Sequence, residues 1–142
     1  MVLEGSCHCG ELKIRYQTAI PPEHTEVRLC QCSFCRKHGA RAATDPQGHL
    51  DIEIAAGAQP SRYQFGLRTS EFLICARCGV YVAAVLLDGE RHLATVNLNA
   101  LLRAAEFPAG SPVEYDAEDA ASRIARRRAR WTPATVRGEG WR

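Results

Sequence analysis

The seven cysteines of this chain have the types and spacing best suited to chemistry, because they fall into three short groups. The groups are Cys7 and Cys9, then Cys30, Cys32 and Cys35, then Cys75 and Cys78. A C-x-C or C-x-x-C pair places two sulfurs on one tight turn, and zinc binds thiolate sulfur at about 2.3 Å in a tetrahedron. Four sulfurs complete a structural zinc site, whereas three leave one position open, as catalytic zinc sites do.

The spacing also indicates which cysteines share an ion. Cys30, Cys32 and Cys35 lie within six residues and can fold around one ion. The other four cysteines form two pairs far apart in sequence, so a site built from both pairs would join the N-terminal segment to the middle of the chain. We therefore expect two zinc ions per chain, one structural and one catalytic.

A histidine offers an alternative for the second site. His38 follows Cys35 by three residues, so its imidazole is a candidate fourth ligand. If His38 completes the site, both metals are structural and the catalytic interpretation fails. The sequence leaves this alternative open.

Disulfide and redox roles for the cysteines are less consistent with the sequence. An odd number of cysteines leaves at least one thiol unpaired. Residues 1–6 lack the basic and apolar regions of a secretory signal, so we expect a cytoplasmic protein with reduced thiols. A redox C-x-x-C motif should open a helix, whereas Cys78 and Gly79 lead into a strand-like run.

Length and composition indicate one globular domain over residues 1–142. Charged residues make up 24% and apolar residues 46% of the chain, which is ordinary for a folded domain. No apolar run approaches the roughly 20 residues of a membrane span. The formal charge of +2 becomes −1 when seven thiolates and two Zn²⁺ ions are counted, so the composition does not favour a nucleic-acid partner. It gives no indication of the oligomeric state.

The hydrophobic pattern predicts a mainly β protein. Leu12, Ile14 and Tyr16 alternate with polar residues, as in a half-buried strand. Residues 80–87 form a longer apolar run that suits a central strand, and Asp88-Gly89 matches a two-residue hairpin turn. Acidic residues at the start of 116–130 and arginines at its end predict one helix near the C-terminus, since this polarity complements the helix dipole.

The three cysteine groups, read with their neighbours, resemble a known family. Ser6-Cys7-His8-Cys9-Gly10, Cys30-Gln31-Cys32-Ser33-Phe34-Cys35 and Cys75-Ala76-Arg77-Cys78-Gly79 resemble the glutathione-dependent formaldehyde-activating enzyme family, also called the centromere-protein-V family. The resemblance spans about residues 4–115. It implies a β-tent fold of small coiled antiparallel sheets, stapled by a zinc site on Cys7, Cys9, Cys75 and Cys78. It implies a catalytic zinc on Cys30, Cys32 and Cys35.

The resemblance also implies a reaction, in which a carbon–sulfur lyase or synthase adds the thiol of glutathione to formaldehyde. Glutathione carries two carboxylates, and the cations next to the cysteines are candidates to bind them: Arg36, Lys37, Arg41 and Arg77. Two alternatives remain at this point. One is the same chemistry on another thiol or aldehyde, and the other is a zinc-stabilised binding module without catalysis.

Overall fold

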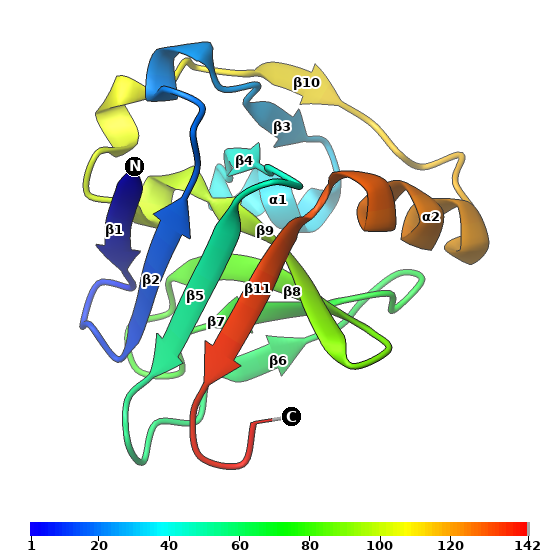
Figure 1. Ribbon diagram of the computed structural model, residues 1–142. Coiled ribbons are helices and arrows are strands. Elements are labelled where there is room, and N and C mark those ends of the chain that lie inside the picture. Colours follow the sequence, from blue (N-terminus) through cyan, green and yellow to red (C-terminus); the bar gives the residue numbers. More distant parts are fainter. Residues whose placement is uncertain (142) are drawn as a thin grey trace.

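A computed structural model describes residues 1–141 of the chain (Figure 1). Its strands are β1 (Val2–Ser6), β2 (Leu12–Gln17), β3 (Arg28–Cys30), β4 (Ala42–Ala43), β5 (His49–Ile54), β6 (Ser61–Tyr63), β7 (Glu71–Ile74), β8 (Tyr81–Asp88), β9 (Arg91–Asn97), β10 (Ser111–Val113) and β11 (Thr132–Arg137). Its helices are α1 (Ser33–His38), α2 (Ala120–Arg130) and the short 3-10 turns η1 (Pro22–His24), η2 (Leu98–Ala100) and η3 (Ala104–Glu106). The predicted mainly β fold with a helix near the C-terminus is confirmed.

The strands form one branched sheet that divides at β9. One path runs in the order β1, β2, β5, β11, β9, β4, β3 and β10, while β8, β7 and β6 extend from the other edge of β9. In Figure 1 the β6–β8 group crosses behind β5 and β11. Buried side chains of β2 and β5 share one apolar cluster with side chains of β7 and β8, so the two groups of strands pack face to face around the core.

The core follows from the side-chain alternation of the strands. Leu12, Ile14 and Tyr16 on β2 are each 1% exposed, whereas the residues between them are exposed. Residues on both faces of β8 are buried over its first six positions, as its uninterrupted apolar run predicts. Both predictions from the hydrophobic pattern are confirmed.

Two strand pairings depart from an antiparallel arrangement. β10 pairs with β3, and β11 pairs with β5, both in parallel. β11 lies between β5 and β9 and was not predicted from sequence. It contains Pro133, which cannot donate a ladder hydrogen bond, and its side chains are mostly half-buried rather than alternating.

Two predicted boundaries are also corrected. The helix expected from residue 116 begins at Ala120, because Asp119 caps it by accepting a hydrogen bond of 2.8 Å from the Ser122 amide. Asp88 pairs with Arg91, so the hairpin turn consists of Gly89 and Glu90 rather than Asp88 and Gly89. Gly89 has a φ of 64°, a conformation that glycine adopts without strain.

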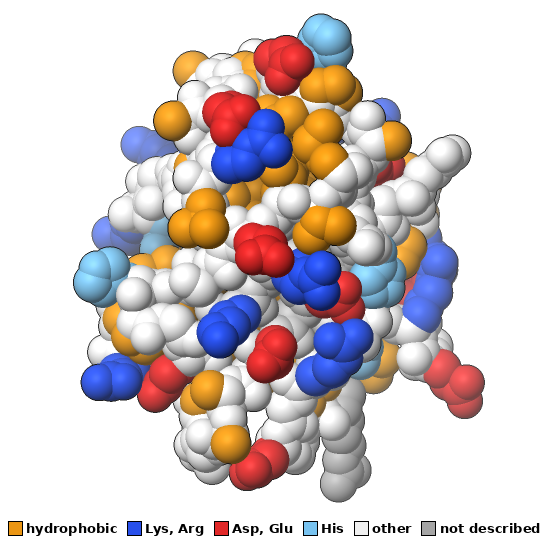
Figure 2. Space-filling model, turned by 60° about the vertical axis from the view of Figure 1, so that its left-hand side comes forward, with side chains coloured by type: hydrophobic (Ala, Val, Ile, Leu, Met, Phe, Trp, Pro, Cys, Tyr) orange, Lys and Arg blue, Asp and Glu red, His pale blue; other side chains and the backbone are white. Residues whose placement is uncertain are grey.

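Charges of both signs are interspersed on the face over the first strands (Figure 2). Arg15 lies 3.8 Å from Glu4, and Arg137 lies 3.1 Å from Asp51. This face therefore carries no continuous basic band of the kind that binds a nucleic-acid backbone. Within the described chain, no helix combines the length and apolar character needed to span a bilayer.

Candidate metal centres and an adjoining cavity

The four-cysteine cluster joins the β1–β2 turn to the β7–β8 turn. The Sγ atoms of Cys7, Cys9, Cys75 and Cys78 all lie within 4.8 Å of one another. Cys9 Sγ is 3.7 Å from Cys7 Sγ and 3.5 Å from Cys75 Sγ. A tetrahedron with metal–sulfur bonds of about 2.3 Å has edges of about 3.8 Å, so these sulfurs could hold a metal ion and their spacing fits zinc.

The two turns of this cluster are built alike. The Cys7 amide donates to the Leu12 carbonyl at 2.9 Å, and the Cys75 amide donates to the Val80 carbonyl at 3.0 Å. Gly10 and Gly79 reverse the chain with φ of 85° and 80°, which glycine adopts most readily. Each turn therefore holds its pair of sulfurs in a defined place.

Backbone amides donate to two sulfurs of this cluster, and burial acts on Cys7. The Leu12 amide donates to Cys7 Sγ at 3.3 Å, and the Cys78 amide donates to Cys75 Sγ at 3.4 Å. Burial nevertheless raises the pKa of Cys7 above its ordinary value, since a thiolate loses hydration there. A cation at the centre of the cluster would compensate this cost.

The three-cysteine cluster forms where β3 runs into α1. Cys30 ends β3, Cys32 caps the N-terminus of α1, and Cys35 lies buried within the helix. All three sulfurs lie within 4.8 Å of one another. The Cys35 amide donates to Cys32 Sγ at 3.4 Å, and Gly39 ends the helix in the left-handed conformation. This single local turn therefore presents three possible metal ligands.

The three thiols of this cluster differ in the direction of their pKa shifts. Hydrogen bonds from Cys30, Cys35 and the Cys35 amide lower the pKa of Cys32. The hydrogen bond with Cys32 raises the pKa of Cys30, and the hydrogen bonds with Cys30 and Cys32 raise the pKa of Cys35. The cluster thus holds one thiolate readily, and a cation is needed to hold all three.

His38 does not join the three sulfurs. It is exposed at the end of α1, and its ring lies 4.5 Å from that of Phe34 and 5.7 Å from that of Tyr81. Across the described chain, no histidine or carboxylate lies within 4.8 Å of all three sulfurs. The arrangement therefore favours a three-cysteine site over the histidine-completed alternative.

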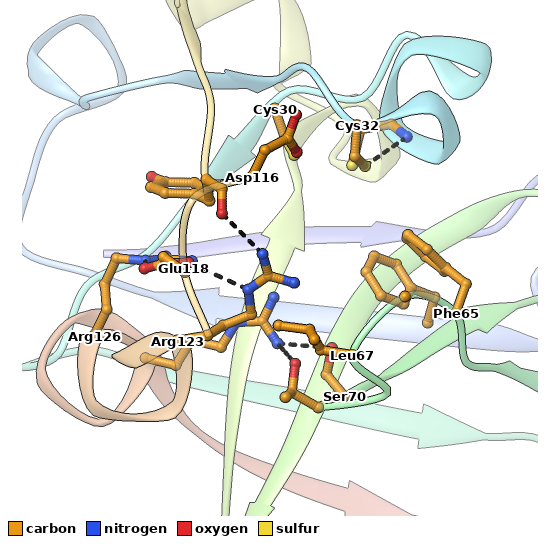
Figure 3. A pocket seen from close by; sticks show the side chains of 15 residues that line it. Cys30, Cys32, Phe65, Leu67, Ser70, Asp116, Glu118, Arg123 and Arg126 are labelled. Carbon is orange, nitrogen blue, oxygen red and sulfur yellow. Dashed lines mark hydrogen bonds and ion pairs between the residues drawn. The ribbon is translucent and has the colours of Figure 1, made fainter. Parts of the chain in front are cut away.

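A cavity of about 320 Å³ opens beside the three cysteines (Figure 3). Cys30, Cys32 and Cys35 form one wall, and Phe65 and Leu67 of the β6–β7 loop form a second. A third wall comes from the segment that leads into α2 and from α2 itself, including Tyr115, Glu118, Arg123, Arg126 and Arg127. Its volume lies at the lower end of the range for ligand pockets, about 300–1,000 Å³.

The four cations expected to bind glutathione do not line this cavity. Arg36 and Lys37 are exposed on α1. Arg41 donates to Asn99 Oδ1 and to the carbonyls of Ala104 and Pro108. Those hydrogen bonds give Arg41 a role in holding the 97–108 segment.

Arg77, the last of the four, lies at the other cluster. Its Nη1 is 4.0 Å from Glu11 Oε1, and its side chain is 72% exposed. It therefore lies near the four-cysteine cluster and not at the cavity. Binding of glutathione by Arg36, Lys37, Arg41 and Arg77 stays a prediction without a cavity to support it.

The arginines of α2 are the site residues that the sequence reasoning missed. Arg123 and Arg126 both donate to Glu118, at 3.2 Å and 2.7 Å, and Arg127 lies beside them in the same wall. Their spacing of three and four residues places them on one helix face. That spacing was the available signal, whereas the sequence pattern predicts only that these arginines complement the helix dipole.

Comparison with known proteins agrees with this architecture. Residues 2–111 match the family model described as glutathione-dependent formaldehyde-activating enzyme. A protein of Halomonas elongata, provisionally named a glutathione-dependent formaldehyde-activating enzyme, is 38% identical over 85 residues, which cover 55% of this chain and 52% of that protein. The chain thus matches about half the length of this curated relative.

A solved structure is also similar. The crystal structure of a Rhodobacter sphaeroides protein matches with a TM-score of 0.51 and 33% identity, covering 70% of this chain and 87% of the other. The family match covers most of the chain and includes both cysteine clusters. The chain therefore belongs to the glutathione-dependent formaldehyde-activating enzyme family.

Proposed function

We propose that this protein is a cytoplasmic zinc enzyme that adds the thiol of glutathione to formaldehyde. In this proposal Cys30, Cys32 and Cys35 hold the catalytic ion, and the four cysteines of the other cluster hold a structural ion. The observation that carries the proposal is the position of the three sulfurs. They lie together at the wall of a cavity and have no fourth ligand among the described histidines and carboxylates.

A zinc ion held by the three sulfurs would offer one open coordination position and lower the pKa of a thiol bound there. Phe65 and Leu67 give the facing wall an apolar surface, and a substrate that displaces water from it would strengthen electrostatic interactions inside the cavity. α2 places positive charge along the third wall. These residues would orient a substrate whose thiol points to the cysteines.

The reaction balances without a redox partner. The substrate sulfur forms a bond to the aldehyde carbon, the carbonyl π bond opens, and the aldehyde oxygen takes up the proton that the thiol loses. The product is a hydroxymethyl thioether, and the reverse reaction is a carbon–sulfur cleavage. The three-cysteine cluster serves this chemistry because the nucleophile is a thiolate.

The test is the formation of S-(hydroxymethyl)glutathione from [¹³C]formaldehyde, followed by exchange NMR with zinc-loaded protein. We expect faster exchange than in buffer alone, and we expect Cys32→Ser to abolish the acceleration while the protein stays folded. If loaded parent protein and buffer give equal exchange rates with several thiols and aldehydes, the binding-module interpretation replaces the enzymatic one.

A further inference from the structure

Arg127 on α2 is a buried charge at the cavity. It is 9% exposed although it carries a guanidinium, and it lines the same cavity as the three cysteines. It lies outside residues 2–111, which match the family model. The feature therefore belongs to the part of this chain that the family match does not cover.

Within residues 1–141, the contacts of Arg127 leave its charge without a counter-ion. Nη1 donates to Thr69 Oγ1 at 2.8 Å and to Ser70 Oγ at 3.1 Å, both of them neutral acceptors. Nε is buried and has no hydrogen-bond partner among residues 1–141. The guanidinium carbon lies 4.4 Å from the centre of the Trp131 ring, which fixes the orientation of the group.

The two carboxylates that line the cavity, Glu118 and Asp116, do not pair with Arg127 in the described chain. Glu118 accepts hydrogen bonds from Arg123 and Arg126. Asp116 also lines the cavity, but within the described residues it forms no ion pair with Arg127. The third wall thus presents three arginines to two carboxylates, and Arg127 is the arginine without an ion-pair partner in the described chain.

A buried arginine without a carboxylate is costly, because desolvation of a charge is repaid only by a charged or hydrogen-bonding partner. Burial, together with repulsion from Arg126 and Arg123, lowers the pKa of Arg127 to about 10. The group remains protonated at neutral pH. An anion entering the cavity would supply the missing partner through charge-assisted hydrogen bonds.

We propose that Arg127 is a specificity-determining residue that binds a carboxylate of the thiol substrate. The assignment rests on the proposed function, because it places the substrate thiol at Cys30, Cys32 and Cys35 across the same cavity. It selects thiols that carry a carboxylate over uncharged thiols. It also moves anion recognition from Arg36 and Lys37, which do not line the cavity, to α2.

The affinity test compares two thiols on cobalt-substituted protein, using the thiolate charge-transfer band. Arg127→Gln should weaken binding of 3-mercaptopropionate by about tenfold to a hundredfold, which corresponds to loss of a hydrogen bond to a charged group. Binding of 2-mercaptoethanol should change by less than about twofold, because it has no carboxylate. Arg130→Gln, on an exposed position of the same helix, is the matched control and should leave both affinities unchanged.

A purely structural role of Arg127 makes a different prediction. If Arg127 only ties α2 to the β6–β7 loop, Thr69→Val combined with Ser70→Ala should reproduce the Arg127→Gln effect. If Arg127 binds the substrate, that double variant should keep the preference for 3-mercaptopropionate over 2-mercaptoethanol. Equal losses for both thiols in Arg127→Gln would also overturn the assignment.

A ligand without a thiol separates this inference from the proposed function. S-methylglutathione keeps both carboxylates but cannot act as a thiol nucleophile. It should shift the Arg127 Nε–Hε NMR signal of the parent protein, a measurement that needs no Arg127 variant to fold. No shift, when thiols do change the cobalt spectrum, would overturn the role of Arg127. A shift without any spectral response to thiols would keep the anion site and reject the thiol chemistry.

Discussion

The two cysteine clusters use similar turns but differ in what faces them. In the four-cysteine cluster, the sulfurs opposite Cys7 and Cys9 come from a second turn more than sixty residues away, and the sulfurs enclose the centre from all sides. In the three-cysteine cluster, all ligands come from one turn, and a cavity takes the place of the second turn. A single local turn therefore leaves room for a substrate, whereas two distant turns form a joint between parts of the fold.

The largest expected effect comes from breaking the joint. Cys75→Ser removes a ligand between the N-terminal strands and the β7–β8 turn. Structural zinc contributes about 10–16 kcal/mol in zinc-finger peptides, so we expect the variant to be unfolded or insoluble at 25 °C. Circular dichroism and soluble yield measure this outcome. A folded Cys75→Ser protein with unchanged stability would remove the distinction between the clusters.

The matched variant at the other cluster should behave differently. Cys32→Ser should give a folded protein with one zinc ion fewer and no catalysis, because β3 and α1 are held by their own backbone contacts as well. Metal analysis together with circular dichroism checks this result. Collapse of Cys32→Ser to the same degree as Cys75→Ser would show that both clusters are structural.

A smaller effect is expected at the third wall of the cavity. Hydrogen bonds from Arg126 and Arg123 lower the pKa of Glu118 from its ordinary value of 4.5. Glu118 therefore adds stability above pH 4.5, and this contribution is lost as the pH falls through its lower folded-state pKa. Glu118→Gln should reduce the free energy of unfolding by about 1–2 kcal/mol at pH 7.

Urea unfolding of the parent and of Glu118→Gln over a pH series provides the measurement. The difference between the two proteins should shrink steadily below pH 4.5, since the parent then loses the same ion pairs. A difference that is constant with pH would mean that the carboxylate charge of Glu118 does not stabilise α2. Metal is released at low pH from the parent and from Glu118→Gln alike, so its effect on stability cancels when the two proteins are compared.

The smallest effect is expected at the exposed cations beside the cysteines. Arg36→Ala and Lys37→Ala should change glutathione affinity by less than about twofold, because exposed charges away from the cavity contribute little. The cobalt titration described above measures it. A tenfold loss in either variant would return glutathione recognition to α1 and would extend the substrate beyond the cavity.

The sequence predicted the features that depend on local spacing. The grouping of the sulfurs into four and three was predictable because each pair or triplet lies on one turn, and the structure brings those sulfurs together. The alternation in the sequence of β2 and the apolar run of β8 likewise predicted which of their residues are buried. Metal binding by either cluster remains a prediction.

Features that depend on docking were not predictable in the same way. The three α2 arginines that line the cavity, Arg123, Arg126 and Arg127, could be placed on one helix face from their spacing, but not against the cavity. Their position follows from long-range contacts, such as Arg127 with Thr69 and Arg128 with Asp88. β11 is similar, because a strand with Pro133 and half-buried side chains is identified only by its partners β5 and β9.

The central claim is that one cluster is closed and the other open. Zinc K-edge X-ray absorption of the fully loaded protein, recorded with and without glutathione, tests it most directly. The account predicts seven sulfurs shared by two zinc ions, with a light oxygen or nitrogen scatterer of a solvent ligand, and eight sulfurs after glutathione is added. An imidazole signal in the free protein, or a sulfur count that glutathione leaves unchanged, would contradict it.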